Sequence, residues 1–135
     1  MKRVFGLPVV LSLVLAACEV TVHDASIVQP TQPGIQNVVF TVDTTYMLSS
    51  PGTLVAQGLA TNSGTGAISA PWYVECTFYT DTTLSIVLGS NDYQVGVPLS
   101  PGESVYWRIE FSSSNVDVRR FPNFTVSTFR AYYKD

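Results

Sequence analysis

Residues 72–80 read WYVECTFYT, and this stretch decides the class of fold. Its apolar side chains alternate with side chains that carry a polar group, and the apolar set is Trp72, Val74, Cys76 and Phe78. Successive side chains of a strand point to opposite faces of the sheet, so a period of two predicts a strand with one face in the core. The opposite face is then expected to meet solvent.

The same period recurs at residues 104–111, where the apolar positions are Val105, Trp107, Ile109 and Phe111. Further strands are predicted at residues 36–44, 54–62, 84–88, 93–97 and 124–134. Alternation in the last of these is less regular, which is typical of a β-bulge or of a strand with two covered faces. Within residues 54–62, Gly58 indicates a bend or a close approach of another backbone.

Turn residues separate these strands. Pro, Gly, Ser and Asn gather at residues 49–52, 62–66, 89–92 and 99–103, where they supply the dihedral angles of tight turns. No stretch beyond residue 34 shows sustained helical periodicity. Six to seven short strands without helices predict an all-β fold, an antiparallel β-sandwich.

The N-terminal segment is typical of an export signal. Lys2 and Arg3 precede an apolar run at residues 4–17. A helix of this length reaches roughly 21 Å, which is short of the ~30 Å hydrocarbon core, so a signal peptide is favoured over a membrane-spanning helix.

Residues 15–18 read LAAC and resemble the lipobox of bacterial lipoproteins. The resemblance implies that the Cys18 thiol receives a diacylglyceryl group and that a peptidase cuts before Cys18. Two or more acyl chains hold a protein stably on a membrane. The alternative is an ordinary secretory signal that a cysteine follows by chance.

Three segments are therefore expected. Residues 1–17 form the signal peptide, residues 18–34 the lipidated cysteine and a flexible tether, and residues 35–135 the folded domain. Pro30, Pro33 and Gly34 argue against regular structure in the tether. The expected location is the cell envelope, on the extracytoplasmic side. Glu19, in place of the Asp that favours inner-membrane retention in enterobacterial lipoproteins, favours the outer membrane if the host has one.

Charge and cysteine content limit the partners. Removal of Lys2 and Arg3 with the signal takes the formal charge from −3 to −5, and no basic stripe is present, so a nucleic-acid partner is not expected. Lipid on Cys18 would leave Cys76 without a disulfide partner. Its place on the apolar face of residues 72–80 predicts a buried, unreactive free thiol.

Three motifs together resemble the FxLYD family of bacterial extracytoplasmic domains. They read GLATN at residues 58–62, VxCxFYxD at residues 74–81 and LSPGES at residues 99–104. Ala60 stands where the family usually has Val. The resemblance covers roughly residues 37–134 and implies an immunoglobulin-like sandwich, often carried on lipoproteins, with no catalytic residues.

The residues offer little for catalysis. The single histidine, His23, lies in the expected tether, whereas a catalytic base is held rigidly beside its nucleophile. Too few Cys and His residues are present for a zinc site. A glycosidase would need a pair of carboxylates, for which Glu75, Asp81, Glu103 and Glu110 are available, but Glu75 and Glu110 are expected on the outer faces of strands, where a solvated charge is the ordinary interpretation. Asp81, Asn91 and Asp92 are interpreted as turn residues rather than calcium ligands. We therefore expect no enzyme activity, no cofactor and no metal.

The outward faces of the two clearest strands supply a candidate partner-binding face, which comprises Tyr73, Glu75, Tyr79, Tyr106 and Arg108. Tyr132 or Tyr133 is expected to join it. Exposed tyrosines are enriched at recognition surfaces, but they also form cross-strand pairs that only stabilise a sheet, and the second interpretation is favoured.

The expected function is that of a membrane-anchored, non-enzymatic binding or structural module with an envelope protein as partner. The alternative is a protein that binds a small ligand, glycan or metal through loops at one end of the sandwich, around residues 63–71 and 112–122. The second of these loops carries Arg119 and Arg120.

Overall fold

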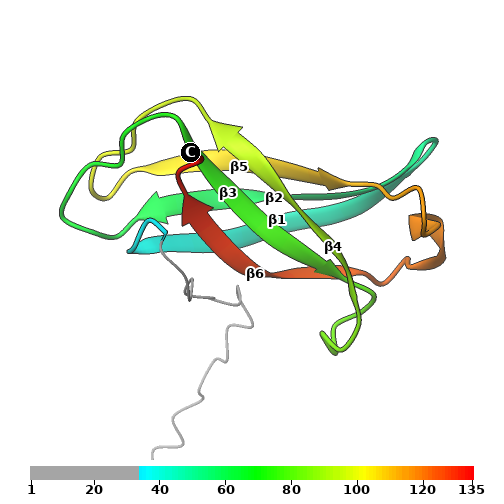
Figure 1. Cartoon of the computed structure of the whole chain (residues 1–135). Coiled ribbons are helices and arrows are strands. Elements are labelled where there is room, and N and C mark those ends of the chain that lie inside the picture. The colour runs from blue at the N-terminus through cyan, green and yellow to red at the C-terminus, as the bar shows by residue number, and fades with distance from the viewer. Residues whose placement is uncertain (1–33) are drawn as a thin grey trace, which may run out of the picture.

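The computed structural model describes residues 34–135, which form two antiparallel three-stranded sheets (Figure 1). One sheet has the strand order β1-β2-β5 and the other β4-β3-β6. The elements are β1 (Val38–Ser49), β2 (Gly52–Asn62), β3 (Trp72–Tyr79), β4 (Val87–Val95), β5 (Ser104–Phe111), the short 3-10 helix η1 (Val118–Arg120) and β6 (Thr125–Tyr132). The all-β prediction is confirmed, and the strands number six.

Strand β3 lies at the centre of its sheet, as the alternation of its sequence predicts. Trp72, Val74, Cys76 and Phe78 are all completely buried, while the residues between them are partly exposed. Pairing with β4 on one side and β6 on the other covers both edges of β3. The prediction for residues 104–111 is confirmed as well, because Trp107 and Ile109 of β5 are buried and Tyr106 is exposed.

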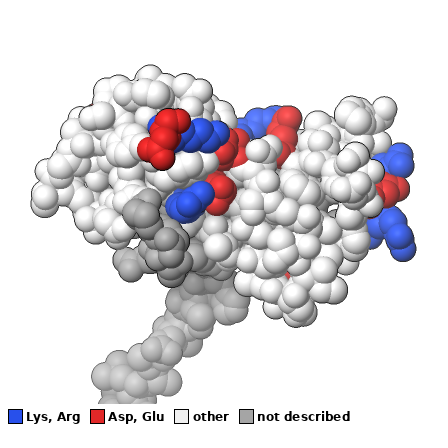
Figure 2. Space-filling view, in the orientation of Figure 1, with Lys and Arg blue, Asp and Glu red and all other residues white. Residues whose placement is uncertain are grey.

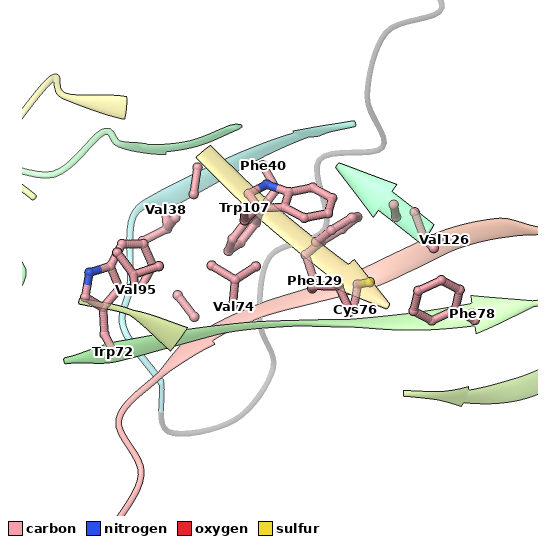
Figure 3. Close-up of a cluster of buried hydrophobic side chains, with 14 of the residues drawn as sticks. Val38, Phe40, Trp72, Val74, Cys76, Phe78, Val95, Trp107, Val126 and Phe129 are labelled. Carbon is pink, nitrogen blue, oxygen red and sulfur yellow. The ribbon is translucent and has the colours of Figure 1, made fainter. Parts of the chain in front are cut away.

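Aromatic side chains join the two sheets into one core (Figure 3). The ring centroids of Phe40 and Phe129 lie 5.3 Å apart, and those of Trp107 and Phe129 also lie 5.3 Å apart. Phe40 and Trp107 belong to the β1-β2-β5 sheet, whereas Phe129 comes from β6. Complete burial of a large apolar side chain contributes up to about 3 kcal/mol, so these contacts hold the sheets face to face.

Gly58 allows Trp107 to lie against the middle of β2. A Cβ atom at Gly58 would overlap the carbonyl group of Thr41 and would lie 2.8 Å from Cζ2 of Trp107. The close approach predicted from the sequence is confirmed.

The turn at residues 99–103 also forms as predicted. The Glu103 amide donates to the Ser100 carbonyl at 3.0 Å, and Gly102 adopts a φ of 81°, which glycine reaches without steric cost. The buried Asn62 fixes this turn to the neighbouring loop, because its Nδ2 donates to the carbonyl groups of Leu99 (3.0 Å) and Gly66 (2.8 Å).

The predictions for residues 84–86 and 89–92 are wrong, whereas residues 87–88 lie in a strand as predicted. Residues 84–86 belong to a loop, and β4 starts only at Val87. Residues 89–92 form no turn, since they pair with residues 75–78 of β3. The polar run is tolerated because β4 is an edge strand. Gly89 serves packing, since a Cβ there would lie 2.6 Å from Cζ of Phe111.

Bulges interrupt the regular pairing of β1 with β2 and of β6 with β3. β1 extends to Ser49, beyond the predicted residue 44, and its register against β2 shifts between Val42 and Thr44. In β6, Thr128 adopts a φ of 57°, and the register against β3 shifts between Glu75 and Thr77. The predicted irregularity of the last strand is thus confirmed as a bulge.

The predicted signal peptide, Cys18, His23 and the tether before Gly34 lie outside the described residues. Within residues 34–135, no helix has the length and apolar character needed to cross a membrane.

Candidate functional site

The five residues of the predicted partner-binding face are divided between the two sheets. Tyr73, Glu75 and Tyr79 lie on β3, whereas Tyr106 and Arg108 lie on β5. Since the inner faces of the sheets meet in the core, the two groups lie on opposite outer faces of the sandwich. Alternation predicts which side chains point outward, but it does not indicate which strands share a sheet.

On the β4-β3-β6 sheet, cations cover the tyrosine rings. The rings of Tyr73 and Tyr132 are 5.6 Å apart between centroids. Lys134 Nζ lies 4.1 Å from the Tyr73 centroid, and the Arg130 guanidinium carbon lies 4.3 Å from that of Tyr132. Tyr73 and Tyr132 form a cross-strand pair of the kind that stabilises a sheet, and the two cations add cation–π contacts to it.

Ion pairs connect the same strands. Arg130 Nη2 lies 3.1 Å from a Glu75 carboxylate oxygen, and Lys134 Nζ lies 2.9 Å from a carboxylate oxygen of Asp92. The Tyr132 hydroxyl donates to Asp92 at 2.5 Å. Acidic and basic side chains therefore lie next to one another on the visible face rather than in patches of one sign (Figure 2).

The carboxylate of Asp92 is held in its charged form. Partial burial acts to raise its pKa, but hydrogen bonds from Tyr132 and Lys134, together with the positive charges of Lys134 and Arg130, outweigh that effect and lower the pKa. The pKa of Tyr132 is raised, chiefly by burial and also by its hydrogen bond to Asp92.

The outer face of the β1-β2-β5 sheet carries a separate polar network. Arg108 forms a 2.6 Å ion pair with Glu110 and donates to the Tyr46 hydroxyl at 2.8 Å. The Tyr106 hydroxyl donates to Gln57 at 3.3 Å, while about half of the Tyr106 side chain stays exposed. Of the five predicted residues, Tyr106 offers the largest free aromatic surface.

Cys76 is a buried free thiol, as predicted. Burial raises its pKa far above the usual range, and the nearby negative charge of Glu75 acts in the same direction. The thiol therefore stays protonated, and its sulfur packs in the core beside Phe129 and Phe78 (Figure 3).

Within residues 34–135, no group of three or more His, Cys, Asp or Glu side chains is placed to hold a metal ion. Asp81 lies in the loop after β3 and binds Thr83, whereas Asp92 lies in the middle of β4 and binds Lys134. The side-chain amide of Asn91 donates through Nδ2 to the backbone carbonyl of Glu110 at 2.6 Å. The carboxylates of Glu75 and Glu110 belong to different sheets.

The two loops of the alternative hypothesis lie at opposite ends of the sandwich, which corrects that part of it. Thr61 pairs with Ser104, so the loop at residues 63–71 lies where β5 begins. Leu54 pairs with Phe111, so the loop at residues 112–124 lies at the other end. Neighbouring strands run antiparallel, and each change of direction moves the next loop to the far end.

We call the end that holds residues 50–51, 80–86 and 112–124 the distal end. Phe78 of β3 stacks on Phe111 and Phe124 there, with centroids 5.3 and 6.1 Å apart. The start of β1, where Val38 pairs with Asn62, and the C-terminus labelled in Figure 1 lie at the other end, which we call the proximal end.

A polar pocket of about 630 Å³ opens at the distal end. It is lined by Pro51, Gly52 and residues 112–119, which include three consecutive serines and Asn115. Asp117 accepts hydrogen bonds from Nε (2.8 Å) and Nη2 (3.1 Å) of Arg119, so the rim carries a neutralised ion pair. Hydroxyl, amide and guanidinium groups make this pocket suited to a polar ligand.

An exposed apolar loop at the distal end escaped prediction from the sequence. Residues 84–88 are predicted to form a short strand, yet residues 84–86 lie in a loop, and Leu84, Ile86 and Val87 are 42%, 61% and 58% exposed. Asp81 and Thr83 give the available signal, because an Asp followed two residues later by Thr favours a side-chain-capped turn.

Comparisons of the chain with protein-family models, with curated proteins and with solved structures give no match.

Proposed function

We propose that the protein is a lipid-anchored, non-enzymatic binding module of the bacterial cell envelope with an immunoglobulin-like β-sandwich. The observation that carries this proposal is the sequence LAAC at residues 15–18, directly after the apolar run at residues 4–14. Lipid on Cys18 would attach the sandwich at its proximal end, through residues 19–33. The distal loops would then point away from the point of attachment.

The chemistry of the described residues supports binding rather than catalysis. Glu75 and Asp92 are held in ion pairs with Arg130 and Lys134, and Cys76 is buried and protonated. A general acid or base needs access to substrate and a pKa near the working pH, and a nucleophile needs its deprotonated form. Binding sites commonly lie on loops at the ends of a rigid scaffold, and residues 112–119 form such a loop beside a polar pocket.

Mass spectrometry of the protein purified from host membranes tests the anchor. The expected product starts at Cys18 and carries diacylglycerol on that residue. A Cys18→Ser variant should leave the membrane fraction. An unmodified N-terminus at Cys18, or a Cys18→Ser variant that stays in the membrane, would contradict the proposal.

A second candidate function is the binding of a small polar ligand such as a glycan, and the pocket at residues 112–119 favours it. Its volume lies within the roughly 300–1,000 Å³ typical of ligand sites. A ligand that binds only the folded state raises the melting temperature, so thermal-shift measurements with mono- and disaccharides and with divalent cations test this function. Asn115→Ala should abolish any shift, and Asn91→Ala, on β4 outside the pocket, should leave it intact.

A further inference from the structure

Leu84, Ile86 and Val87 form the most concentrated exposed apolar group in residues 34–135, and we call it the apolar knob. The other large exposed hydrophobic residues are the cross-strand pair of Leu59 and Tyr106, and the single residues Leu48, Tyr93, Val97, Val116 and Tyr133. Single exposed apolar residues are normal on a soluble domain. Three within four positions, two of them in a loop and the third at the start of β4, form a patch of the kind that marks interaction sites.

Hydrogen bonds close the loop that carries the knob. The Thr80 amide donates to the Ile86 carbonyl at 3.0 Å, across the base of the loop. Asp81 accepts hydrogen bonds from the amide (2.9 Å) and the hydroxyl (2.5 Å) of Thr83. The knob is therefore presented on a closed turn and needs little ordering on binding, which favours affinity.

The backbone at Leu84 is unusual. Its φ is 58°, in the left-handed region that bulky residues enter at a cost in free energy. Glycine or asparagine would serve the turn better, so the turn itself does not explain the leucine. Strained residues of this kind gather at binding and switch sites.

The knob lies at the distal end, because Tyr79 at the end of β3 pairs with Thr125 at the start of β6. The start of the described chain lies at the proximal end, because Val38 pairs with Asn62 and the Ile35 amide donates to the Ala131 carbonyl. If the chain is anchored through residue 18, the knob points away from the anchor.

Charge argues against an anionic lipid surface as the occupant. Residues 34–135 carry five basic and eight acidic side chains, and four of the five basic groups are held in ion pairs. The loop itself holds Asp81 and no basic residue. Segments that bind anionic membranes carry clusters of free Lys and Arg.

Area argues against a second copy of the chain. Three partly exposed aliphatic side chains offer on the order of 200 Å², well below the roughly 800 Å² that each partner buries in a stable interface. A partner with a groove would surround the loop and also cover Thr82, Thr83 and Ser85, all of them exposed. These hydroxyl side chains would give the apolar centre a polar rim, the usual anatomy of a protein interface.

We propose that the apolar knob inserts into an apolar groove of another envelope protein and is the main anchor of that complex. The inference rests on the proposed function, since it names the surface through which the binding module acts.

Photocrosslinking in the host tests the proposal. A photoreactive phenylalanine derivative is placed at Ser85, within the loop, and at Ser104 as a matched control on the outer face of the other sheet. The expected result is an adduct with one other polypeptide from position 85 and none from position 104. Sequencing of the adduct should place the partner's crosslinked residue among apolar residues.

Substitutions in the knob then decide the role of the aliphatic side chains. Ile86→Ser combined with Val87→Thr should reduce the adduct, and the affinity of the purified pair, by about 10-fold or more, whereas Ile86→Leu should preserve both. The melting temperature should stay the same, because these side chains are exposed.

The proposal would be overturned if position 85 gave no adduct, an adduct with lipid or an adduct with a second copy of the chain. It would also be overturned by equal adducts from positions 85 and 104, or by an adduct that the Ile86→Ser and Val87→Thr substitutions do not reduce. Failure of lipidation at Cys18 is read separately by mass spectrometry. It would remove the anchor without removing the knob.

Discussion

Asn62 is the buried polar residue on which the proximal end depends most. Its side chain donates to the carbonyl groups of Leu99 and Gly66 and accepts from the Gly64 amide at 3.0 Å. We expect Asn62→Ala to lower the free energy of unfolding by about 2–3 kcal/mol, because three hydrogen bonds of a buried side chain are lost at about 1 kcal/mol each, although the Leu99 carbonyl keeps the Ile68 amide as a donor. Urea unfolding monitored by tryptophan fluorescence measures the change.

Thr61→Ala is the matched control for this prediction. Its hydroxyl shares one exposed hydrogen bond with Ser104, so its loss should cost less than about 1 kcal/mol. Equal losses from both substitutions would contradict a special role for Asn62.

Gly58 is required for the close packing of β2 against β1 and Trp107. A methyl group there would overlap the Thr41 carbonyl and crowd Trp107, so we expect Gly58→Ala to destabilise the domain by about 3 kcal/mol or more. Gly96→Ala is the control, because no atom lies within 4 Å of the position of its Cβ. The control should change the free energy of unfolding by less than about 0.5 kcal/mol, and a Gly58→Ala protein as stable as the Gly96→Ala protein would show that β1 can move away.

The alternation of apolar and polar residues predicts the strands that bury one face in the core. β3 and β5 end within one residue of the predicted positions, because both carry strict apolar alternation. β4 could not be predicted in this way, since an edge strand needs few apolar residues. Its residues 89–92 have turn composition, yet their backbone pairs with β3. The apolar residues just before β4 suggested a strand, but they form the exposed knob.

The candidate site was less predictable than the fold, for a physical reason. Outward-facing residues follow from alternation, but their neighbours depend on the order of strands in the sheets. The prediction that Tyr73 and Tyr106 point outward is therefore right, but the two residues lie on opposite outer faces of the sandwich. Likewise, the antiparallel order of strands, which the sequence does not state, separates the loops at residues 63–71 and 112–124.

The three strands of the β4-β3-β6 sheet are connected by a network that should respond to acid. The lowered pKa of Asp92 means that its charged form is favoured in the folded state, so this contribution to stability is fully present above the unfolded pKa of about 3.9. It is lost as the pH falls below that value and through the folded pKa. We expect the stability lost between pH 6 and pH 3 to be smaller in Asp92→Asn than in the wild type.

Thermal melts at several pH values test this effect, with Asp43→Asn as the control. Asp43 is an exposed residue at the bulge of β1, away from this network. If Asp92→Asn and the wild type lose equal stability on acidification, Asp92 does not carry the effect. Tyr132→Phe, which removes one hydrogen bond to the carboxylate, should fall between the two.

The two sheets share a single core, so we expect them to unfold together. Phe129 of β6 contacts Phe40 of β1 and Trp107 of β5, so one side chain links both sheets. Only a few other contacts close the seam between β1 and β6. One of them is the hydrogen bond from the Ile35 amide to the Ala131 carbonyl, 2.8 Å long.

The folded unit begins close to residue 34. Ile35 packs against the core, and its amide is bonded to β6, whereas Gly34 is the first described residue. A chain that starts at Gly34 should therefore melt within about 2 °C of the chain that starts at Cys18. A chain that starts at Val38 loses the packing of Ile35 and its hydrogen bond, about 2 kcal/mol together, and should melt roughly 10 °C lower.

Ile35→Ala in the chain that starts at Gly34 separates the two contributions, because it removes most of the side chain and keeps the backbone hydrogen bond. It should melt between the two truncated chains. If the start at Gly34 already lowers the melting temperature as far as the start at Val38 does, residues before 34 contribute to the fold. The tether would then be part of the domain, and the distance between the membrane and the distal loops would be set by packing and not by the length of a free segment.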